Sequence, residues 1–147
     1  DALLAASAVG YLIARNATIA GAQGGCQAEV GAASAMAAAA AVQLHGGSPR
    51  QSLAAAGIAL VGLMGLICDP IGGLVESPCQ GRNATGAAQA LVAAEEALAG
   101  VEAPVPLDEI IAAMYVVGRA MPRELRETAL GGVAAAPSAC RRCGGCG

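Results

Sequence analysis

The sequence predicts an all-α protein, a compact helical bundle rich in alanine and glycine, and three observations favour this fold. Hydrophobic residues make up 56% of the chain, yet Phe and Trp are absent and only two tyrosines occur. Alanine favours helices, whereas strands favour β-branched and aromatic side chains. Helix start and stop signals follow one another with short breaks between them. At 147 residues, the chain is long enough for one domain with its own core.

The expected helices, in chain order, span residues 2–15, 28–44, 49–66, 83–98 and 108–121. Asp1 would cap the first helix, and the glycine pair at 46–47 would end the second. The third helix has the strongest start signal. Ser48 is a favoured N-cap, Pro49 suits the first helical position and Gln51 completes a capping box.

The second half of the chain has its own boundary signals. The Cys-Asp-Pro sequence at 68–70 stops the third helix, and Asp69 is expected to cap the short segment that follows. Asn83 opens the fourth helix. A proline-containing link at 104–106 precedes the last helix. From residue 131 onward the sequence is rich in Gly, Ala and Cys and lacks apolar periodicity, which predicts no further long helix.

These signals predict two parts of unequal size. Residues 1–130 would form the helical unit, a catalytic α-domain fragment, and residues 131–147 a flexible, cysteine-rich C-terminal tail. The chain begins with Asp1 rather than Met, so we interpret it as one piece of a longer polypeptide.

Composition excludes several classes of partner. The formal net charge of −3 argues against nucleic acid. The uncharged runs at 30–44 and 53–68 are shorter than the ~20 residues that span a bilayer, which argues against a membrane span. We see no basic region ahead of an apolar stretch, and hence no signal peptide. A core of this size needs no disulfide staples, so we expect reduced thiols and a cytoplasmic protein.

Lysine is absent, and all eight basic residues are arginines. A pyridoxal phosphate enzyme needs a lysine for its Schiff base, so this chain cannot hold that cofactor covalently. The phosphate-binding lysine of a P-loop is excluded on the same ground.

Three distant cysteines, each within a glycine-rich polar cluster, are the candidate chemical centre. Cys26 lies before a predicted helix, Cys68 follows one, and Cys79 lies in the loop leading to Asn83. Thiolates are soft ligands suited to iron–sulfur clusters or zinc, and three of them leave one metal position open for a substrate. Three buried cysteines acting as small hydrophobic residues would fit the spacing equally well.

The tail carries three more cysteines in a C-x2-C-x2-C pattern, Cys140, Cys143 and Cys146. A thiol on a flexible tail could occupy the open metal position. The three could instead hold a separate zinc ion or stay free.

Three stretches carry a resemblance to a known family. Residues 15–31, 68–84 and 127–134 resemble the iron–sulfur L-serine dehydratase (L-serine ammonia-lyase) family, specifically the C-terminal part of its α domain or α chain. The two longer stretches contain all three distant cysteines. The resemblance therefore favours a metal-binding role over idle buried thiols.

The resemblance implies a lyase of serine catabolism and gluconeogenesis that converts L-serine to pyruvate and ammonia. It implies that Cys26, Cys68 and Cys79 hold a 4Fe–4S cluster, with no pyridoxal phosphate, and that one iron acts as a Lewis acid. A C-terminal cysteine would occupy that iron in the resting enzyme. Cys146 is our candidate, with Cys143 and Cys140 as alternatives.

The implied partners are L-serine, the β domain or β chain of the same enzyme, and a second copy in a homodimer. The β domain and the upstream α segment of the family pattern are missing from this sequence, which puts independent activity in question. Two alternatives remain at this point. The same chemistry could act on threonine or cysteine, or the chain could be a non-catalytic iron–sulfur or structural protein.

Candidates for the general base are Glu29, Glu76 and His45, although a lone histidine at a helix end favours a C-terminal cap. The candidate substrate contacts are Asn16, Gln27, Asp69, Arg82 and Asn83. Arg82 could bind the serine carboxylate or pair with Asp69 or Glu76. The charges at 123–127 are expected to form a solvated surface.

Overall fold

The computed structural model describes residues 1–142, apart from the side chains of Cys140 and Arg142, and confirms the all-α prediction. Helical segments follow one another as α1 (Ala2–Asn16), α2 (Gly21–Gly24), the π-helical turn η1 (Gln27–Gly31), α3 (Ala32–Leu44), α4 (Pro49–Gly62), the 3-10 turn η2 (Ile71–Gly73), α5 (Cys79–Leu98), α6 (Leu107–Ala120), the 3-10 turns η3 (Arg123–Leu125) and η4 (Gly132–Ala135), and α7 (Pro137–Arg142). Within residues 1–142 the one β-type pairing is an isolated parallel bridge between Cys68 and Arg126.

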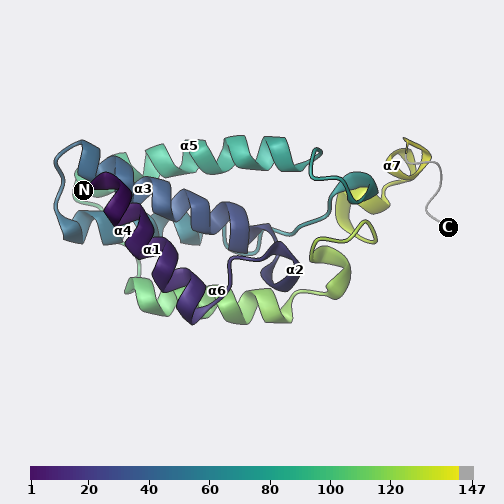
Figure 1. Cartoon of the computed structure of the whole chain (residues 1–147), viewed down its shortest axis with the longest axis horizontal. Helices are drawn as coiled ribbons and strands as arrows, with labels where there is room; N and C mark the ends of the chain where they lie inside the picture. The colour runs from purple at the N-terminus through teal and green to yellow at the C-terminus, as the bar shows by residue number, and fades with distance from the viewer. Residues whose placement is uncertain (143–147) are drawn as a thin grey trace.

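Helix α3 forms the centre of the bundle and packs against α1, α4 and α5 (Figure 1). Its alanines Ala35, Ala38 and Ala39 are fully buried. Small side chains at these crossings let the helix axes approach closely, as the alanine content predicted. The larger buried side chains, Ile13, Leu60, Ile110, Ile111 and Met114, fill the space between α1, α4 and α6. The bundle therefore offers a packed support for the loops at its ends.

The predicted start of α4 is confirmed. The N–H of Gln51 donates to Ser48 Oγ (3.3 Å), and the Gln51 side chain accepts the N–H of Ser48 (2.9 Å). Pro49 occupies the first turn. Gly46, after the end of α3, has a φ of +74°, the left-handed conformation that favours glycine at this point. Asp1 holds the N-cap position of α1 but makes no side-chain capping bond.

Two predicted helix boundaries near the cysteines are wrong. Helix α4 ends at Gly62 rather than near residue 66, because the chain turns at Gly65 with a φ of +86°. The N–H of Gly65 donates to Gln27 Oε1 (2.8 Å), which fixes that turn against the start of η1. Helix α5 begins at Cys79 rather than at Asn83. Cys79 therefore lies in the first helical turn and not in a loop.

The expected role of Asp69 as a helix cap is also wrong. Pro70 takes the N-cap position of η2, and the Asp69 side chain points elsewhere, to Arg82 and to the backbone of Val133. This second contact holds part of the region expected to be a flexible tail. Residues 132–135 and 137–142 form η4 and α7, which pack against each other and against η2.

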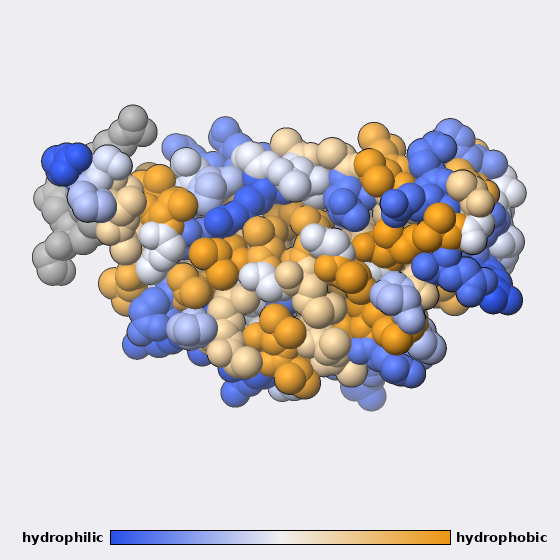
Figure 2. All heavy atoms as spheres, turned by 180° about the vertical axis from the view of Figure 1, so that it is seen from behind, coloured by the Kyte–Doolittle hydropathy of each residue, from blue (hydrophilic) through white to orange (hydrophobic). Residues whose placement is uncertain are grey.

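Apolar side chains remain exposed on several elements. Among those more than half exposed are Leu3, Leu4, Tyr11, Leu91 and Val116. Figure 2 shows apolar residues gathered along the middle of one face, with hydrophilic residues mainly at its ends and edges. No helix within the described residues is long and apolar enough to cross a membrane. An exposed apolar surface of this kind is typical of a protein that packs against further chain.

Candidate metal centre

Cys26 and Cys68 come together at the end of the bundle where α3 begins and α4 has ended, and Cys79 lies at the same end, where α5 begins (Figure 1). Cys26 directly precedes η1, Cys68 lies in the segment after α4, and Cys79 is the first residue of α5. Their exposed fractions are 2%, 3% and 7%, and all three are free thiols. Residue type alone suggested that these cysteines could share a site. The packing of α3 between α4 and α5 brings the segments that carry them to the same end of the bundle.

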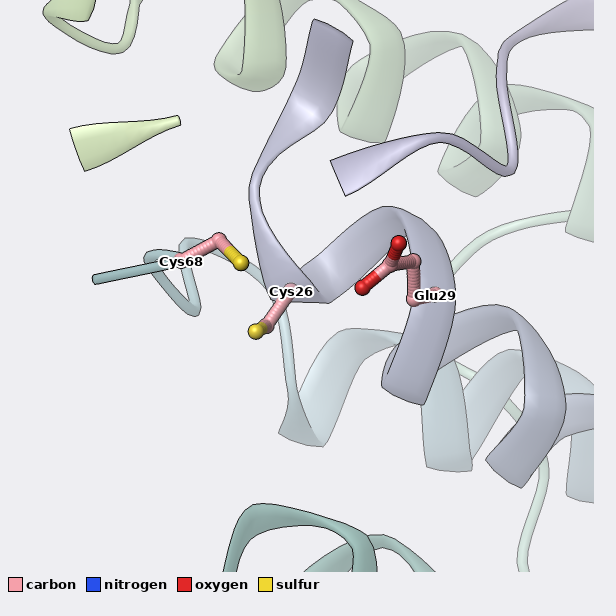
Figure 3. A group of neighbouring side chains, drawn as sticks. All are labelled: Cys26, Glu29 and Cys68. Atoms are coloured by element: carbon pink, nitrogen blue, oxygen red, sulfur yellow. The ribbon is translucent and has the colours of Figure 1, made fainter. Parts of the chain in front are cut away.

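Cys26, Cys68 and Glu29 form the closest group of donor atoms. Their two Sγ atoms and one carboxylate oxygen all lie within 4.8 Å of one another. Figure 3 shows the Cys68 thiol and the Glu29 carboxylate on either side of Cys26, whose own thiol points away from Glu29. Two thiols and a carboxylate are a donor set that can hold a metal ion. Cys79 lies outside this closest group, but its charge is near enough to raise the pKa of the Cys26 thiol.

Backbone contacts hold the Cys26 and Cys68 segments together. The N–H of Gln27 donates to the carbonyl of Leu66 (2.9 Å). Gly25, with a φ of +74°, passes close to the same carbonyl, and a Cβ there would lie 2.8 Å from it. A side chain at residue 25 would therefore push the two segments apart. The π-helical turn that follows is a feature often found at functional sites.

Glu29 is held by the start of α2. The N–H of Gly21 donates to Glu29 Oε1 (3.2 Å), and a Cβ at Gly21 would lie 2.9 Å from the same carboxylate. Glu29 is largely exposed as a residue, so its carboxylate lies at the edge of the buried thiol group. This position leaves the carboxylate open to solvent or substrate on one side and to the thiols on the other.

Residues from the C-terminal part of the chain complete the other side of the site. The N–H of Cys68 donates to the carbonyl of Leu125 (2.8 Å), and the N–H of Glu127 donates to the carbonyl of Cys68 (2.7 Å). These two bonds place Arg126 opposite Cys68 in the parallel bridge. Of the charges at 123–127 that were expected to be solvated, Arg123, Glu124 and Glu127 are exposed, whereas Arg126 is half-buried and its backbone is paired with Cys68.

Asp69 joins three segments at the site. Its side chain is fully buried, accepts a short hydrogen bond from Arg82 Nη1, and accepts the N–H of Val133 (2.6 Å). Gly132 passes so close that a Cβ there would overlap Asp69 Oδ2. The Arg82 guanidinium, held by Asp69, also lowers the pKa of Cys26. The ion pair predicted as one alternative for Arg82 is thus the one observed.

Burial raises the pKa of both thiols. For Cys26, desolvation outweighs the lowering effects of Cys68 and Arg82. For Cys68, desolvation is reinforced by Cys26 and by the negative charges of Glu29 and Glu127, so its pKa lies well above the ordinary range. Desolvation lowers the pKa of Arg82, but the hydrogen bond and charge of Asp69 and the contributions of Cys26 together outweigh it, so this pKa is raised. In the metal-free chain both thiols are therefore protonated at neutral pH, and a bound metal would have to displace their protons.

Two of the three predicted amide contacts, Gln27 and Asn16, have hydrogen-bond partners elsewhere in the protein. Gln27 is buried with its amide engaged at both ends, because Nε2 donates to the carbonyl of Met114 (3.0 Å) and Oε1 accepts the N–H of Gly65. Asn16 is exposed and donates to the carbonyl of Leu12 within α1 (3.0 Å). Asn83 is exposed in α5, one residue after Arg82.

The three base candidates are separated by the fold. His45 is exposed at the C-cap of α3, as a lone histidine at a helix end predicted. The length of α3 places it about 20 Å from the cysteine end of the bundle. Glu76 is exposed in the segment between η2 and α5. Glu29 alone among these candidates has its carboxylate beside the thiols.

Of the tail cysteines, Cys143 and Cys146 lie outside the described residues. Cys140 belongs to α7, which packs against η2 and so lies near the segment that follows Cys68.

These features define a class: an all-α protein with buried, convergent thiols at one end of its bundle and a carboxylate at their edge. Comparison with known proteins identifies the family within that class. The family described as "Serine dehydratase alpha chain" matches residues 1–134, and the chain belongs to it.

Individual relatives agree with this assignment. The chain is 56% identical over 136 residues to the probable L-serine dehydratase, alpha chain, of Bacillus subtilis, covering 92% of this chain and 45% of the relative. It is 53% identical over 134 residues to the L-serine dehydratase, alpha chain, of Peptoniphilus asaccharolyticus, covering 91% and 46%. It is 48% identical over 132 residues to L-serine dehydratase 1 of Escherichia coli, covering 89% and 29%. The chain thus spans about half the length of these α chains and less than a third of the E. coli protein.

Proposed function

We propose that this chain is the metal-bearing part of an L-serine dehydratase, a lyase that removes water from L-serine and yields pyruvate and ammonia. The observation that carries the proposal is the convergence of Cys26 and Cys68, with Cys79 close by, in a chain of the serine dehydratase α-chain family. The relatives named L-serine dehydratase support the choice of substrate.

The proposed cofactor is a 4Fe–4S cluster held by Cys26, Cys68 and Cys79. The donor set fits such a group, because the three thiols are free, buried and soft, and the Arg82 guanidinium acts on Cys26. Cys146 remains the proposed fourth ligand of the resting enzyme, with Cys143 and Cys140 as alternatives. A single metal ion on Cys26, Cys68 and Glu29 is the competing arrangement, and metal analysis separates the two.

When bound, the cluster would supply a Lewis-acid iron that stabilises the departing β-hydroxyl of serine. The chain's own residues have other tasks. Burial of the thiols keeps water from their side of the site. Glu29 is our candidate for the base that takes the α-proton, since its carboxylate lies within 4.8 Å of the thiols and the N–H of Gly21 orients one of its oxygens. The aminoacrylate released by the elimination would tautomerise and hydrolyse to pyruvate and ammonia.

The proposed substrate contacts differ in how well their positions support them. Arg82 and Asn83 lie on neighbouring positions of α5 at the cysteine end, whereas Asn16 lies at the end of α1. Asp69 and Gln27 are occupied by contacts within the protein, so any role in substrate binding would be indirect.

The proposed partners are the remaining part of the α chain and a β domain or β chain. The chain's share of its relatives' length and its exposed apolar side chains support this proposal. A homodimer and a cytoplasmic location belong to the same proposal.

The test is turnover by the complete enzyme, with this chain joined to its companion segments and loaded with iron under anaerobic conditions. We expect pyruvate from L-serine, with threonine and cysteine as slower substrates. Cys26→Ser, Cys68→Ser and Cys79→Ser should each abolish turnover, and Ser52→Ala, a buried polar change in α4, should retain it. Efficient keto-acid release only from threonine or cysteine would move the proposal to that substrate. No release from any of the three would overturn it.

A further inference from the structure

Arg126 is a cation at the thiol site that the sequence alone did not single out. Its backbone is paired with Cys68 through the two hydrogen bonds made by Cys68 N–H and Glu127 N–H. Residues directly opposite in such a pair project their side chains from the same face. The Arg126 side chain therefore starts on the face from which the Cys68 thiol reaches Cys26 and Glu29.

The guanidinium of Arg126 reaches the backbone of α2, the helix that precedes Cys26. Its Nη1 donates to the carbonyl of Gln23 at 3.5 Å, a long and weak hydrogen bond. Gln23 lies in α2, three residues before Cys26. Arg126 thus spans the gap between the segments that carry the two closest thiols.

The Nε atom of Arg126 is buried and has no hydrogen-bond acceptor among the described residues. A buried charged donor without an acceptor is rare in folded proteins and strongly unfavourable. An acceptor outside the described residues is therefore expected at this position.

Nearby carboxylates do not meet this need. Both oxygens of Asp69 are used, one by Arg82 and the other by the N–H of Val133. Glu29 accepts the N–H of Gly21 at the start of α2. Arg82 differs from Arg126 in this respect, because it forms an ion pair with Asp69 and also lowers the pKa of Cys26. Arg126 has no equivalent carboxylate in the described part of the chain.

We propose that Arg126 is a positioning residue for the metal group, and that its Nε–H donates to anionic sulfur on the Cys68 side of the loaded site. The assignment rests on the proposed iron–sulfur function and deepens it. Hydrogen bonds and positive charge beside the sulfur ligands favour the reduced state of a cluster and help to retain it. Arg82 and Arg126 would then both balance charge on the thiol group.

The test compares the iron-loaded wild-type chain with Arg126→Gln and Arg126→Lys. Arg126→Gln should give a more negative midpoint potential and release iron to a chelator roughly ten- to hundredfold faster. Arg126→Lys, which keeps the charge but loses the Nε donor, should fall between Arg126→Gln and wild type. Arg50→Gln is the matched control, because Arg50 is exposed at the opposite end of α4 and should leave both measurements unchanged.

Circular dichroism of each metal-free variant separates loss of fold from loss of the proposed contact. If Arg126→Gln is folded and matches wild type in potential and iron release, the assignment is wrong. An unchanged potential with a raised KM for L-serine in the complete enzyme would instead make Arg126 a substrate-binding residue, and would also overturn it. A wild-type chain that takes up iron without sulfide would overturn the proposed cluster, and Arg126's role with it.

Discussion

Asp69 shows how much one residue contributes to the site. Its buried carboxylate connects the Cys68 segment, the first turn of α5 through Arg82, and the C-terminal segment through Val133. The same Arg82 acts on the Cys26 thiol. A side chain that the sequence suggested as a helix cap or a substrate contact is therefore the connection between three parts of the site.

Asp69→Asn should destabilise the metal-free chain by about 3 kcal/mol, because it leaves the Arg82 charge without its buried partner. The measurement is urea unfolding followed by circular dichroism. The control is Glu102→Gln, which breaks the exposed ion pair with Arg50 and should change stability by about 0–1 kcal/mol. Equal effects of the two substitutions on the free energy of unfolding would show that the buried Asp69–Arg82 pair stabilises the chain no more than the exposed pair does.

The raised pKa values of Cys26 and Cys68 predict a pH dependence of stability. A thiol that stays protonated in the folded state, but ionises on unfolding, stabilises the fold below its unfolded pKa. For these residues that ordinary value is 9.0. The metal-free, reduced chain should therefore lose stability as the pH rises from about 8 to about 10. Cys68→Ala should flatten this loss in urea unfolding curves, and an undiminished loss in that variant would contradict the assignment.

At the scale of the elements, the sequence predicted correctly those helix boundaries that depend on interactions between residues close together in the chain. The Ser48–Gln51 capping box and the glycine after α3 were predicted correctly, because each depends on residues a few positions apart. The end of α4 and the start of α5 were not. Gly65 is held by the distant Gln27 side chain, and no local signal could indicate that contact.

Some residues of the site could likewise be predicted from the sequence, and others could not. Three cysteines in glycine-rich polar clusters could be proposed as ligands from residue type, and the family resemblance strengthened that proposal. Arg126 could not be predicted from residue type, because the position of its backbone beside Cys68 depends on a single bridge between segments far apart in the chain. The C-terminal turns at 132–135 and 137–142 were missed because their attachment depends on Asp69 and Val133.

Gly132 provides a test at this scale. Its φ of +59° disfavours any side chain, and a Cβ at this residue would overlap Asp69 Oδ2. Gly132→Ala should detach the C-terminal segment and remove the hydrogen-exchange protection of the Val133 amide. Gly46→Ala is the matched control, because Gly46 also has a positive φ, +74°, but a Cβ there would have nothing within 4 Å. Retained protection at Val133 in Gly132→Ala would show that the segment is held elsewhere.

At the scale of the whole molecule, the chain has a packed helical core and exposes large apolar side chains on its surface. Large apolar side chains on α1, α5 and α6 are exposed, and the chain covers 45% and 46% of the relatives named as α chains. In the proposed enzyme, companion segments would cover this surface. The thiols lie at one end of the bundle, where additional chain could close the site without disturbing the core (Figure 1).

We therefore expect the isolated chain to bind iron and sulfide without converting L-serine, and to gain turnover when the companion segments are added. The measurement is pyruvate formation by the iron-loaded chain alone and by the assembled enzyme. Equal turnover in both would contradict the proposal that other segments complete the site.

The most direct test of the central claim is the iron and sulfide content of the anaerobically reconstituted chain, measured with its electron paramagnetic resonance spectrum after reduction. Convergence of Cys26, Cys68 and Cys79 on one cluster predicts about four irons and four sulfides per chain. Replacing any one of the three by serine should remove most of both, whereas Cys143→Ser should retain them. Zinc or a single iron without sulfide, or full cluster content after loss of Cys79, would contradict the account.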